Sequence, residues 1–448
     1  MFQSEIYGSG QKMSSPFALR LKKSFVKEDS LENEAVNLYP EIQYQKILGF
    51  GGAFTESAAY NYSLLNDVQR QLFLKSYFQR GNGLGYNFCR IPINSCDFSL
   101  SPYTYVEEND TELQTFSLRH DEKYLIPMLK AAVKESDGHL SFFASPWSPP
   151  GWMKNNGSVF QGGKLLPQYA DLWGEYFARF IEGYRKKGIQ IVAVTAQNEP
   201  KAAQTWESCQ YTAKEEADFI VRHLKPALER HGLGNVGILL WDHNKERMFE
   251  RACGSFQTEG ARQAVWGIGF HWYSGSHFQS LDLAAQAFPE KKLIATEFCL
   301  GGKQDLTVTA EDALLYSQEI SGDLNHGASA VVDWNLILDE KGGPYHNRSF
   351  GCKAPVVYQS ESKSVKYTPV FTAIGHFSRL IEKGAIRIAN STYSPSLLCT
   401  SVQNPDKSII AVLTNKMISS QNIIIRISGQ SLPVAIGGKS MLTLKITD

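Results

Sequence analysis

The feature that most constrains the fold is an alternation of short apolar runs with longer segments of helical period, repeated eight times along the chain. Several runs are continuously apolar and rich in β-branched or aromatic residues, as expected of parallel strands covered on both faces. The runs lie at 47–51, 88–93, 140–145, 191–196, 237–241, 267–272, 293–296 and 329–334. Eight strand and helix units over roughly 340 residues predict an α/β protein with a (β/α)8 TIM barrel. A doubly wound open sheet is the alternative.

The segments between these runs have the period and the ends of helices. Apolar residues recur at i, i+3 and i+4 over 66–78, 121–134, 169–188 and 213–232. Two of these segments end at Gly188 and Gly232, and glycine is common just past the end of a helix. The intervening segments therefore favour helices that cover the outside of the predicted sheet.

The sequence changes character after a predicted helix over 368–382. Short strand-like runs follow at 385–389, 396–402, 408–415, 422–428 and 440–446, separated by Ser, Asn, Asp, Gly and Pro. Extended runs also occur at 17–23 and 34–39, and chain termini often lie close together. We therefore predict a barrel domain over 45–382 and an all-β sandwich domain built from 1–44 and 383–448.

Charge and hydropathy narrow the class of partner. Lys+Arg and Asp+Glu number 45 each, and no long run of one sign occurs, which argues against a nucleic-acid partner. No stretch reaches the ~18 consecutive apolar residues of a membrane span. The first twenty residues lack an apolar signal core, so we expect a cytoplasmic protein; secretion with a removed signal stays open. The oligomeric state is left open.

The cysteine and histidine patterns indicate neither a disulfide framework nor a metal site. The chain has seven cysteines, an odd number without a repeated CxxC spacing, so we expect reduced thiols. His271, His243 and His277 show no HxxxH spacing. No metal and no cofactor is expected.

Two glutamates each follow an apolar strand. In (β/α)8 barrels, catalytic residues lie at the carboxyl ends of the strands. Glu199 stands in the sequence VTAQNEP after the fourth predicted strand, and Glu297 follows the seventh in LIATEF. Retaining glycoside hydrolysis needs one carboxyl as general acid/base and a second, ~5 to 5.5 Å away, as nucleophile. The pair therefore predicts Glu199 as acid/base and Glu297 as nucleophile. The negative charge of Glu297 is expected to raise the pKa of Glu199 and keep it protonated. Strand-end caps or ion-pair partners are the structural alternative.

Aromatic and polar residues cluster at the same strand ends, as a sugar site requires. They are Arg90, Asn94 and Asp97 after the second strand, Trp147 and Trp152 after the third, His271, Trp272 and Tyr273 at the sixth, and Asp333, Trp334 and Asn335 at the eighth. Arg90 is interpreted either as a substrate contact or as a residue that orients a catalytic carboxylate. Asp97 either binds a hydroxyl group or caps a loop.

An ordered set of motifs resembles glycoside hydrolase family 30, the group that includes glucosylceramidase. The motifs are GFGGAFTESAA from residue 49, YFQRGNGLGYNFCRIPINSCDFS, FFASPWSPPGWMKNNG, VTAQNEP, FHWY, ATEFC, VVDWNLILDEKGGP and YTPVFTAIGHFSRLI. The resemblance implies a (β/α)8 barrel fused to a β-sandwich and a retaining mechanism. It implies the same two catalytic glutamates, with Asp97, Trp147, Asn198, Tyr273 and Trp334 lining the sugar subsite. Asn198 would bind the 2-hydroxyl.

The resemblance leaves the substrate open. A β-D-glucosidase acting on β-glucosides, β-1,6-gluco-oligosaccharides or glucosylceramide-like substrates is our expectation. A β-xylosidase, xylanase or β-fucosidase of the same family is an alternative, and a non-catalytic carbohydrate-binding protein is a remote one. The loop YHNRSFGCKAPVV departs from the glucosylceramidase pattern, so its polar contribution, from Asn347 or a neighbour, stays undecided. Asp242, His243 and Asn244 follow the fifth strand and are expected on the rim.

Overall fold

Eight parallel strands close into a barrel in the order β10-β11-β13-β5-β6-β7-β8-β9. The computed structural model describes residues 1–10, 13, 17–27, 34–302 and 305–448. The barrel strands are β5 (Gly49–Ala53), β6 (Phe88–Ile93), β7 (Ser141–Pro146), β8 (Ile191–Thr195), β9 (Gly237–Asn244), β10 (Gly267–His271), β11 (Lys292–Glu297) and β13 (Ala328–Asn335). Each predicted run contains or overlaps one of these strands. The barrel is confirmed, and the open-sheet alternative is wrong.

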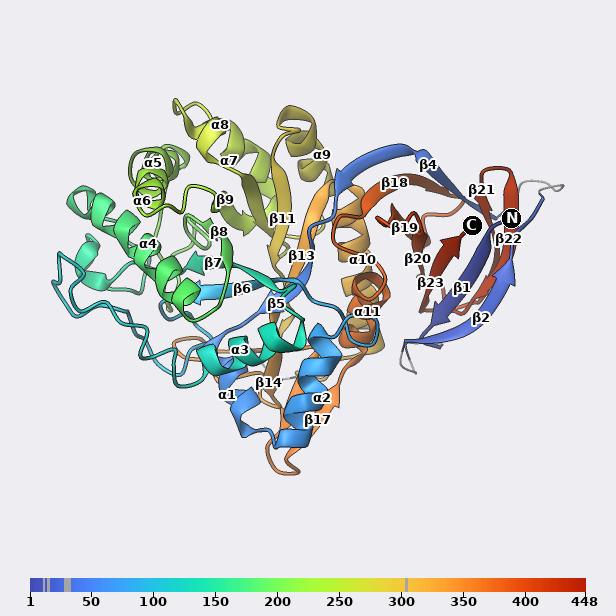
Figure 1. Ribbon diagram of the computed structural model, residues 1–448, viewed down its shortest axis with the longest axis horizontal. Helices are drawn as coiled ribbons and strands as arrows, with labels where there is room; N and C mark the ends of the chain where they lie inside the picture. The colour runs from blue at the N-terminus through green and yellow to red at the C-terminus, as the bar shows by residue number, and fades with distance from the viewer. Residues whose placement is uncertain (11–12, 14–16, 28–33, 303–304) are drawn as a thin grey trace.

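The helices lie around the outside of the barrel (Figure 1). They are α1 (Glu56–Leu64), α2 (Asp67–Phe78), α3 (Leu125–Glu135), α4 (Ala170–Lys186), α5 (Ala213–Phe219), α6 (Lys225–Arg230), α7 (Met248–Ser255), α8 (Ala261–Ala264), α9 (Phe278–Ala287), α10 (Ala310–Asn325) and α11 (Pro369–Ser378). Asn66 and Gln69 form a reciprocal capping box at the start of α2. Gly188 and Gly232 adopt φ values of 82° and 66° just past α4 and α6, where a side chain would be strained.

The single helix predicted over 213–232 is divided by a π-helical turn. This turn, η4 (Ile220–Leu224), joins α5 to α6. Pro226 lies at the start of α6 and has no backbone N–H to donate to the preceding turn. A π turn at this point changes the hydrogen-bond register where the donor is missing.

Gly51 explains one constraint within the GFGGAF motif. A Cβ atom on Gly51 would lie 1.8 Å from the carbonyl oxygen of Phe88, in the neighbouring strand β6. Any side chain at this position would push β5 and β6 apart, so the first strand must carry glycine here to close the barrel.

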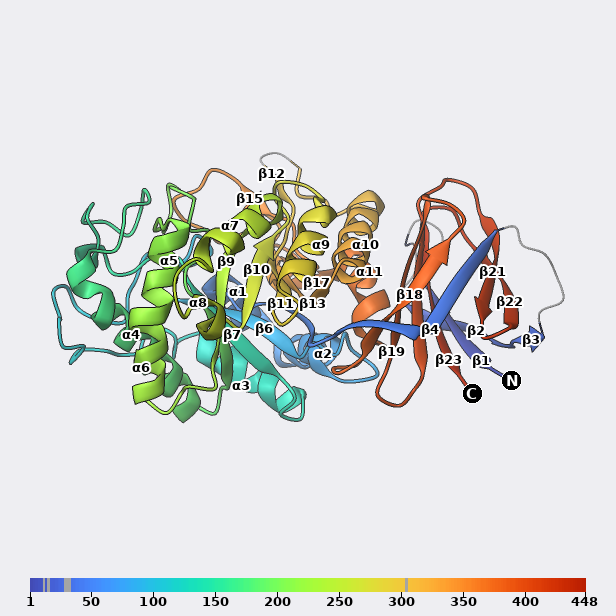
Figure 2. The same cartoon turned by 90° about the horizontal axis from the view of Figure 1, so that it is seen from above.

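The β domain lies beside the barrel and contains both chain termini (Figures 1 and 2). Its strands run in the order β2-β1-β23-β20-β19-β18-β4-β21-β22-β3. Their bounds are β1 (Gln3–Gly8), β2 (Ala18–Ser24), β3 (Val26–Lys27), β4 (Ala35–Lys46), β18 (Ile386–Thr392), β19 (Leu397–Gln403), β20 (Ile409–Asn415), β21 (Gln421–Ile427), β22 (Gln430–Ile436) and β23 (Ser440–Thr447). These strands enclose their own core, which includes Ile6, Val36 and Leu444. The predicted sandwich with N-terminal strands is therefore confirmed.

Helices α10 and α11 lie between the barrel and the β domain (Figures 1 and 2). Polar side chains join the two domains: Ser321 and Thr400 share a hydrogen bond of 2.7 Å, and His376 and Thr443 share one of 2.9 Å. Strand β4 extends to Lys46, which pairs with Ile386 in β18. Residues 45 and 46 thus lie in a strand of the β domain, while the division at 45 and 382 stays a prediction.

Short strands outside the barrel form two further small sheets. β14 (Ile337–Asp339), β16 (Val356–Gln359) and β17 (Ser364–Tyr367) form one small sheet, and β12 (Gly301–Gly302) pairs with β15 (Gly351–Cys352). None of these strands was predicted.

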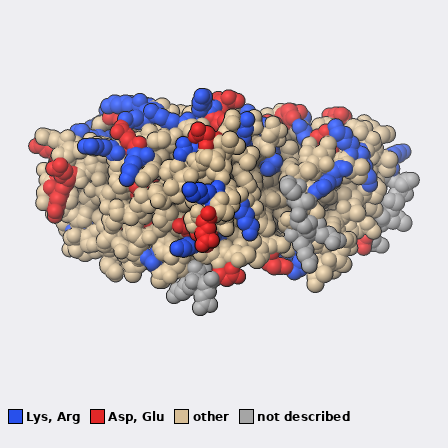
Figure 3. Space-filling model, turned by 90° about the horizontal axis from the view of Figure 1, so that it is seen from below, with Lys and Arg blue, Asp and Glu red and all other residues tan. Residues whose placement is uncertain are grey.

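Among the described residues, no helix has the length and apolar character needed to cross a membrane. Figure 3 shows one face of the molecule, on which side chains of both charges are interspersed.

Candidate active site

A cavity of about 330 Å³ contains both candidate glutamates. It lies where the carboxyl ends of the barrel strands meet the loops that follow them. Its lining is formed by Asp97, Trp147, Asn198, Glu199, Gln204, Trp206, His243, Asn244, Tyr273, Glu297, Cys299, Gly301, Trp334, Arg348, Phe350 and Cys352. Five of the predicted sugar-binding residues are in this set: Asp97, Trp147, Asn198, Tyr273 and Trp334. The structure therefore places them beside the glutamate pair, and their individual roles stay predictions.

Glu199 is held in a backbone conformation that few non-glycine residues adopt. Its φ is 46°, in the left-handed region. Two backbone hydrogen bonds impose this conformation: the Glu199 N–H donates to the carbonyl of Asp242, and the Glu199 carbonyl accepts from Ala202. Such local strain persists only where the surrounding structure enforces it, which is common at active sites. Here it turns the carboxylate after β8 into the cavity.

Glu297 is the last residue of β11, and each of its carboxylate oxygens has a donor. Arg90 Nη1 donates to Oε2 at 2.5 Å, and the Tyr273 hydroxyl donates to Oε1 at 2.7 Å. Both bonds fix the orientation of the carboxylate and supply a donor to each oxygen. A carboxylate prepared in this way is suited to attack rather than to proton donation.

Arg90 joins five partners beneath the cavity, one of which is the Thr296 carbonyl at 3.5 Å from Nη1. Its side chain has an exposed fraction of 0%. Besides Glu297, it donates from Nη2 to Asn198 Oδ1 at 2.9 Å and to Asp242 Oδ2 at 2.8 Å. Its Nε–H donates to the Ser145 hydroxyl at 3.0 Å. Because Arg90 is not among the lining residues, the geometry favours the interpretation that it orients the carboxylates.

Replacing Arg90 by lysine should lower the free energy of unfolding by about 3 kcal/mol or more, because one ammonium group cannot satisfy two buried carboxylates and an amide. Urea denaturation measures this change. Arg262→Lys is the matched control: Arg262 pairs with Glu290 at the surface, where such a pair contributes roughly 0 to 1 kcal/mol. Equal effects of the two substitutions would contradict the assignment of Arg90 as the buried side chain that pairs with Glu297 and Asp242.

His271 connects Glu199 to Asp242. Its Nδ1 lies 3.1 Å from Glu199 Oε1, and its Nε2 lies 3.2 Å from Asp242 Oδ1. Burial alone would lower the pKa of His271, but Glu297, Asp242 and Glu199 raise it to about 9. Both ring nitrogens therefore carry protons at neutral pH and donate to the two carboxylates. His271 is fully buried and does not line the cavity.

This arrangement corrects the expected ionisation of Glu199. Burial raises the pKa of Glu199, but the hydrogen bond from His271 and the charges of His243 and His271 together hold it below the ordinary value of 4.5. The sequence reasoning considered only repulsion from Glu297 and predicted the opposite direction. His271, whose pKa is raised to about 9, lies one hydrogen bond from the Glu199 carboxylate.

Aromatic rings form one wall of the cavity. Trp147 and Trp334 stack with centroids 5.3 Å apart and planes 29° apart. The Arg90 guanidinium lies 4.7 Å from the centroid of Trp147, which holds the ring from below. Tyr273 is half-exposed at the rim, with 43% of its surface accessible, although its hydroxyl reaches Glu297. A flat apolar sugar face could stack on this wall.

Some predicted rim residues lie elsewhere. Trp152 packs against Tyr169 outside the cavity. Asp333 accepts a hydrogen bond from Tyr316, and Asn335 accepts one from Thr55, so both are bonded within the protein. Their side chains follow the alternation of β13: Trp334 enters the cavity, while its two neighbours point the other way. Asp242 is also fully buried, whereas His243 and Asn244 line the cavity.

Sequence reasoning missed a buried arginine in the cavity wall. Arg348 forms an ion pair with Asp97 and lies between the rings of Phe98, Trp206 and Phe350, at 4.9, 5.1 and 4.3 Å from their centroids. It follows Asn347 directly, so the loop that departs from the glucosylceramidase pattern supplies a cation. Burial raises the pKa of Asp97 to about 6 despite this partner. No strand period marks this loop, which is why the sequence offered no signal.

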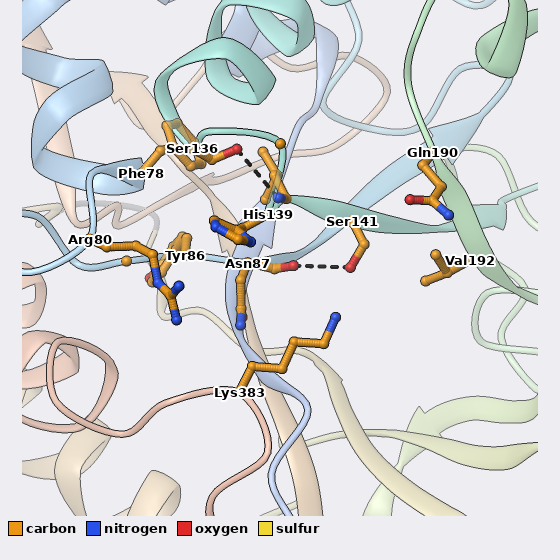
Figure 4. A pocket seen from close by; sticks show the side chains of 13 residues that line it. Phe78, Arg80, Tyr86, Asn87, Ser136, His139, Ser141, Gln190, Val192 and Lys383 are labelled. Atoms are coloured by element: carbon orange, nitrogen blue, oxygen red, sulfur yellow. Dashed lines mark hydrogen bonds between the residues drawn. The ribbon is translucent and has the colours of Figure 1, made fainter. Parts of the chain in front are cut away.

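A second cavity, of about 250 Å³, lies at the opposite end of the barrel (Figure 4). Arg80, His139 and Lys383 reach it from separate segments, and its described lining residues include no carboxylate. It therefore lacks the pair that glycoside hydrolysis requires. Within the described part of the chain, no group of three or more His, Cys, Asp or Glu side chains is placed to hold a metal ion.

Comparison with known proteins identifies the class. A family model described as "Glycosyl hydrolase family 30 TIM-barrel domain" matches residues 47–381, and the "Glycosyl hydrolase family 30 beta sandwich domain" matches 384–444. The fold and the paired carboxylates thus belong to a glycosidase that hydrolyses O-glycosyl bonds. The chain is a member of glycoside hydrolase family 30.

Three relatives show the range of this similarity. Lysosomal acid glucosylceramidase of Mus musculus is 35% identical over 89% of this chain and 80% of its own length. The endo-1,6-beta-D-glucanase of Neurospora crassa is 28% identical over 84% of this chain and 80% of its own length. The crystal structure of SrfJ from Salmonella typhimurium superposes with a TM-score of 0.94, covers 99% of both chains and is 31% identical.

Proposed function

We propose that the protein is a retaining β-D-glucosidase with Glu297 as nucleophile and Glu199 as general acid/base. The observation that carries the proposal is the different bonding of the two glutamates within one cavity. Glu297 accepts bonds from Arg90 and Tyr273, which orient it as the nucleophile, whereas Glu199 contacts a protonated histidine. A double displacement needs one group of each kind.

In the first step, a Glu297 carboxylate oxygen attacks the anomeric carbon and the bond to the leaving oxygen breaks. His271 passes its Nδ1 proton to Glu199 Oε1 through their hydrogen bond, and Glu199 passes a proton on to the leaving oxygen. Asp242, which is itself paired with Arg90, accepts a hydrogen bond from His271 Nε2 and keeps the ring in place. In the second step, Glu199 accepts a proton from water and returns it to His271, the water oxygen bonds to the anomeric carbon, and the bond from that carbon to Glu297 breaks.

Asn198 is prepared to bind the sugar through its amide nitrogen. Its Oδ1 already accepts a hydrogen bond from Arg90, so the Nδ2 hydrogens remain for a ligand in the cavity. A donor at this place suits the 2-hydroxyl oxygen next to the anomeric carbon. Hydrogen bonds to that hydroxyl strengthen in the transition state.

The relatives support glucose as the sugar that is released or transferred. One is named a glucosylceramidase and another an endo-1,6-beta-D-glucanase; the first name refers to a glucosyl group and the second to a β-linked glucan. We therefore propose β-glucosides, including β-1,6-gluco-oligosaccharides and glucosylceramide-like compounds, as substrates. Xylosides and fucosides are the alternatives within the family.

A panel of aryl β-glucoside, xyloside, fucoside and galactoside tests the proposal, with the released sugar followed by NMR. We expect glucose to be released fastest and to appear first as the β anomer. First appearance of the α anomer would rule out retention, while faster release of xylose or fucose would replace glucose as the preferred sugar.

Arg348 should determine how tightly the sugar binds. In Arg348→Met the ring contacts of the side chain are largely kept, but Asp97 becomes a buried carboxylate without a cation. We expect kcat/KM for an aryl β-glucoside to fall by about tenfold or more, since a hydrogen bond to a charged group contributes roughly 1.5 to 3 kcal/mol. Arg222→Met, at an exposed position, is the control. Unchanged kinetics in Arg348→Met would remove Arg348 from sugar binding.

The alkaline limb of the pH profile should report on His271. Its pKa is about 9 in the folded protein against an ordinary 6.5, so the proton contributes stability that is complete below about pH 6.5 and is lost as the pH rises through about 9. We expect kcat/KM to fall with a midpoint near pH 9. Asp242→Asn should move this midpoint to lower pH because it removes a charge that raises the pKa.

His277→Gln is the control for the pH experiment, because His277 is an exposed histidine outside the cavity. It should leave the midpoint in place. A wild-type midpoint below pH 7 would show that the proton does not lie on His271.

A further inference from the structure

Two thiols from distant parts of the chain meet in the wall of the catalytic cavity. Cys299 follows Glu297 by two residues, and Cys352 ends β15. Their Sγ atoms are 3.2 Å apart, and both residues line the cavity. They are buried, with exposed fractions of 7% and 3%. All seven cysteines are free thiols.

The backbone holds the two thiols close together. Gly301 and Cys352 are paired in the antiparallel β12–β15 ladder, and the Lys353 N–H donates to the Leu300 carbonyl at 2.7 Å. A disulfide bond is about 2.05 Å long, so the sulfur atoms need to approach by roughly 1 Å. Side-chain rotation and a small loop shift could supply that movement.

We propose that Cys299 and Cys352 form a modification site, at which a small oxidant such as a peroxide converts the two thiols into a disulfide and thereby lowers turnover. One thiolate attacks a peroxide oxygen and becomes a sulfenic acid as hydroxide leaves. The second thiolate attacks that sulfur, the S–S bond forms, and a second hydroxide leaves; the two hydroxides take up the two protons that the thiols released. With hydrogen peroxide, two thiols lose two electrons and two protons, and two water molecules are produced.

The effect on turnover follows from the neighbours of Cys299. The Cys299 carbonyl accepts a hydrogen bond from Trp272 Nε1 at 3.0 Å, and its Sγ lies 3.5 Å from the Tyr273 hydroxyl. That hydroxyl donates to Glu297. A shift of Cys299 therefore displaces Glu297 in two ways: through the Tyr273 hydroxyl that contacts both residues, and through the short backbone segment between residues 297 and 299. Displacement of a reacting group by about 1 Å can cost up to roughly 10²-fold in rate.

The pair should react slowly at neutral pH. The contact between Cys299 and Cys352, together with burial, raises the pKa of Cys299 well above the ordinary 9.0. The titratable and charged groups that act on these thiols are Tyr273, Glu297, Tyr316 and Arg348. Since the thiolate is the reacting form, oxidation should accelerate between pH 7 and pH 9.

The experiment treats the full-length protein with hydrogen peroxide. Intact mass should fall by about 2 Da, and peptide mapping without reductant should link the peptides that contain residues 299 and 352. We expect kcat/KM for an aryl β-glucoside to fall at least tenfold and to recover after dithiothreitol. The mass measurement needs no substrate, so it tests the linkage even if the proposed glucosidase activity fails.

Three cysteine variants make the test specific. Cys299→Ser and Cys352→Ser, each compared with its own untreated activity, should lose the mass change and resist inhibition. Cys253→Ser is the matched control, because Cys253 is half-buried and outside this cavity, and it should respond like the wild type. Wild-type protein that shows no 299–352 linkage, or that forms the linkage with unchanged turnover, would overturn the proposal.

Discussion

Replacing Glu297 by glutamine should lower hydrolysis of an aryl β-glucoside by roughly 10⁴-fold or more, the scale of loss seen when a covalent nucleophile is removed. An amide oxygen is a poor nucleophile, and Arg90 and Tyr273 would then donate to a neutral group. Arg90 keeps its contact with Asp242, so the fold should survive. The loss is measured as kcat/KM.

A covalent trap distinguishes the nucleophile from a residue that only binds substrate. A 2-deoxy-2-fluoro-β-glucoside should add one glycosyl group to the wild type, located at Glu297 by peptide mapping, and none to Glu297→Gln. Glu259→Gln makes the same chemical change at an exposed position and should keep full activity. Retention of more than about a tenth of the activity in Glu297→Gln would contradict the covalent mechanism.

Replacing Glu199 by glutamine should have an effect that depends on the leaving group. Proton donation contributes roughly 10²- to 10⁴-fold, so we expect a loss of that size for an alkyl β-glucoside, whose alkoxide leaves poorly. A dinitrophenyl β-glucoside needs little protonation in the first step and should show a much smaller loss in that step. The measurement is the ratio of kcat/KM for the two substrates.

The same ratio provides the control for this prediction. Glu259→Gln should leave both rates unchanged, because its side chain is exposed. Equal losses on the two substrates in Glu199→Gln would indicate that Glu199 supports the structure of the site and does not transfer the proton.

The barrel could be predicted because its strands are local patterns with clear ends. The run over 88–93 coincides with β6, and glycines stop α4 and α6 where expected. Strand β22 was missed because it contains Pro433, which usually argues against a strand. Near the edge of the β domain, where β22 pairs with the two-residue β3, the missing N–H is tolerated.

The candidate site could be predicted only in part. Trp147, Asn198 and Trp334 follow strand ends, so the barrel topology alone brings them to one rim. Arg348 comes from a loop without periodicity, and its place beside Asp97 depends on how that loop packs.

The spacing of apolar residues and the residues that end each strand or helix by themselves determined the class of fold. They also determined which strand ends carry Glu199 and Glu297, and the aromatic character of their surroundings. These properties are local, and a parallel barrel gathers all of its strand ends on one face. Only the tertiary structure decided that His271 lies within hydrogen-bond distance of Glu199, that Arg90 is buried beneath the cavity, and that Cys299 touches Cys352. Ionisation and thiol contact depend on burial and on distances of a few ångströms between remote segments, which no local pattern specifies.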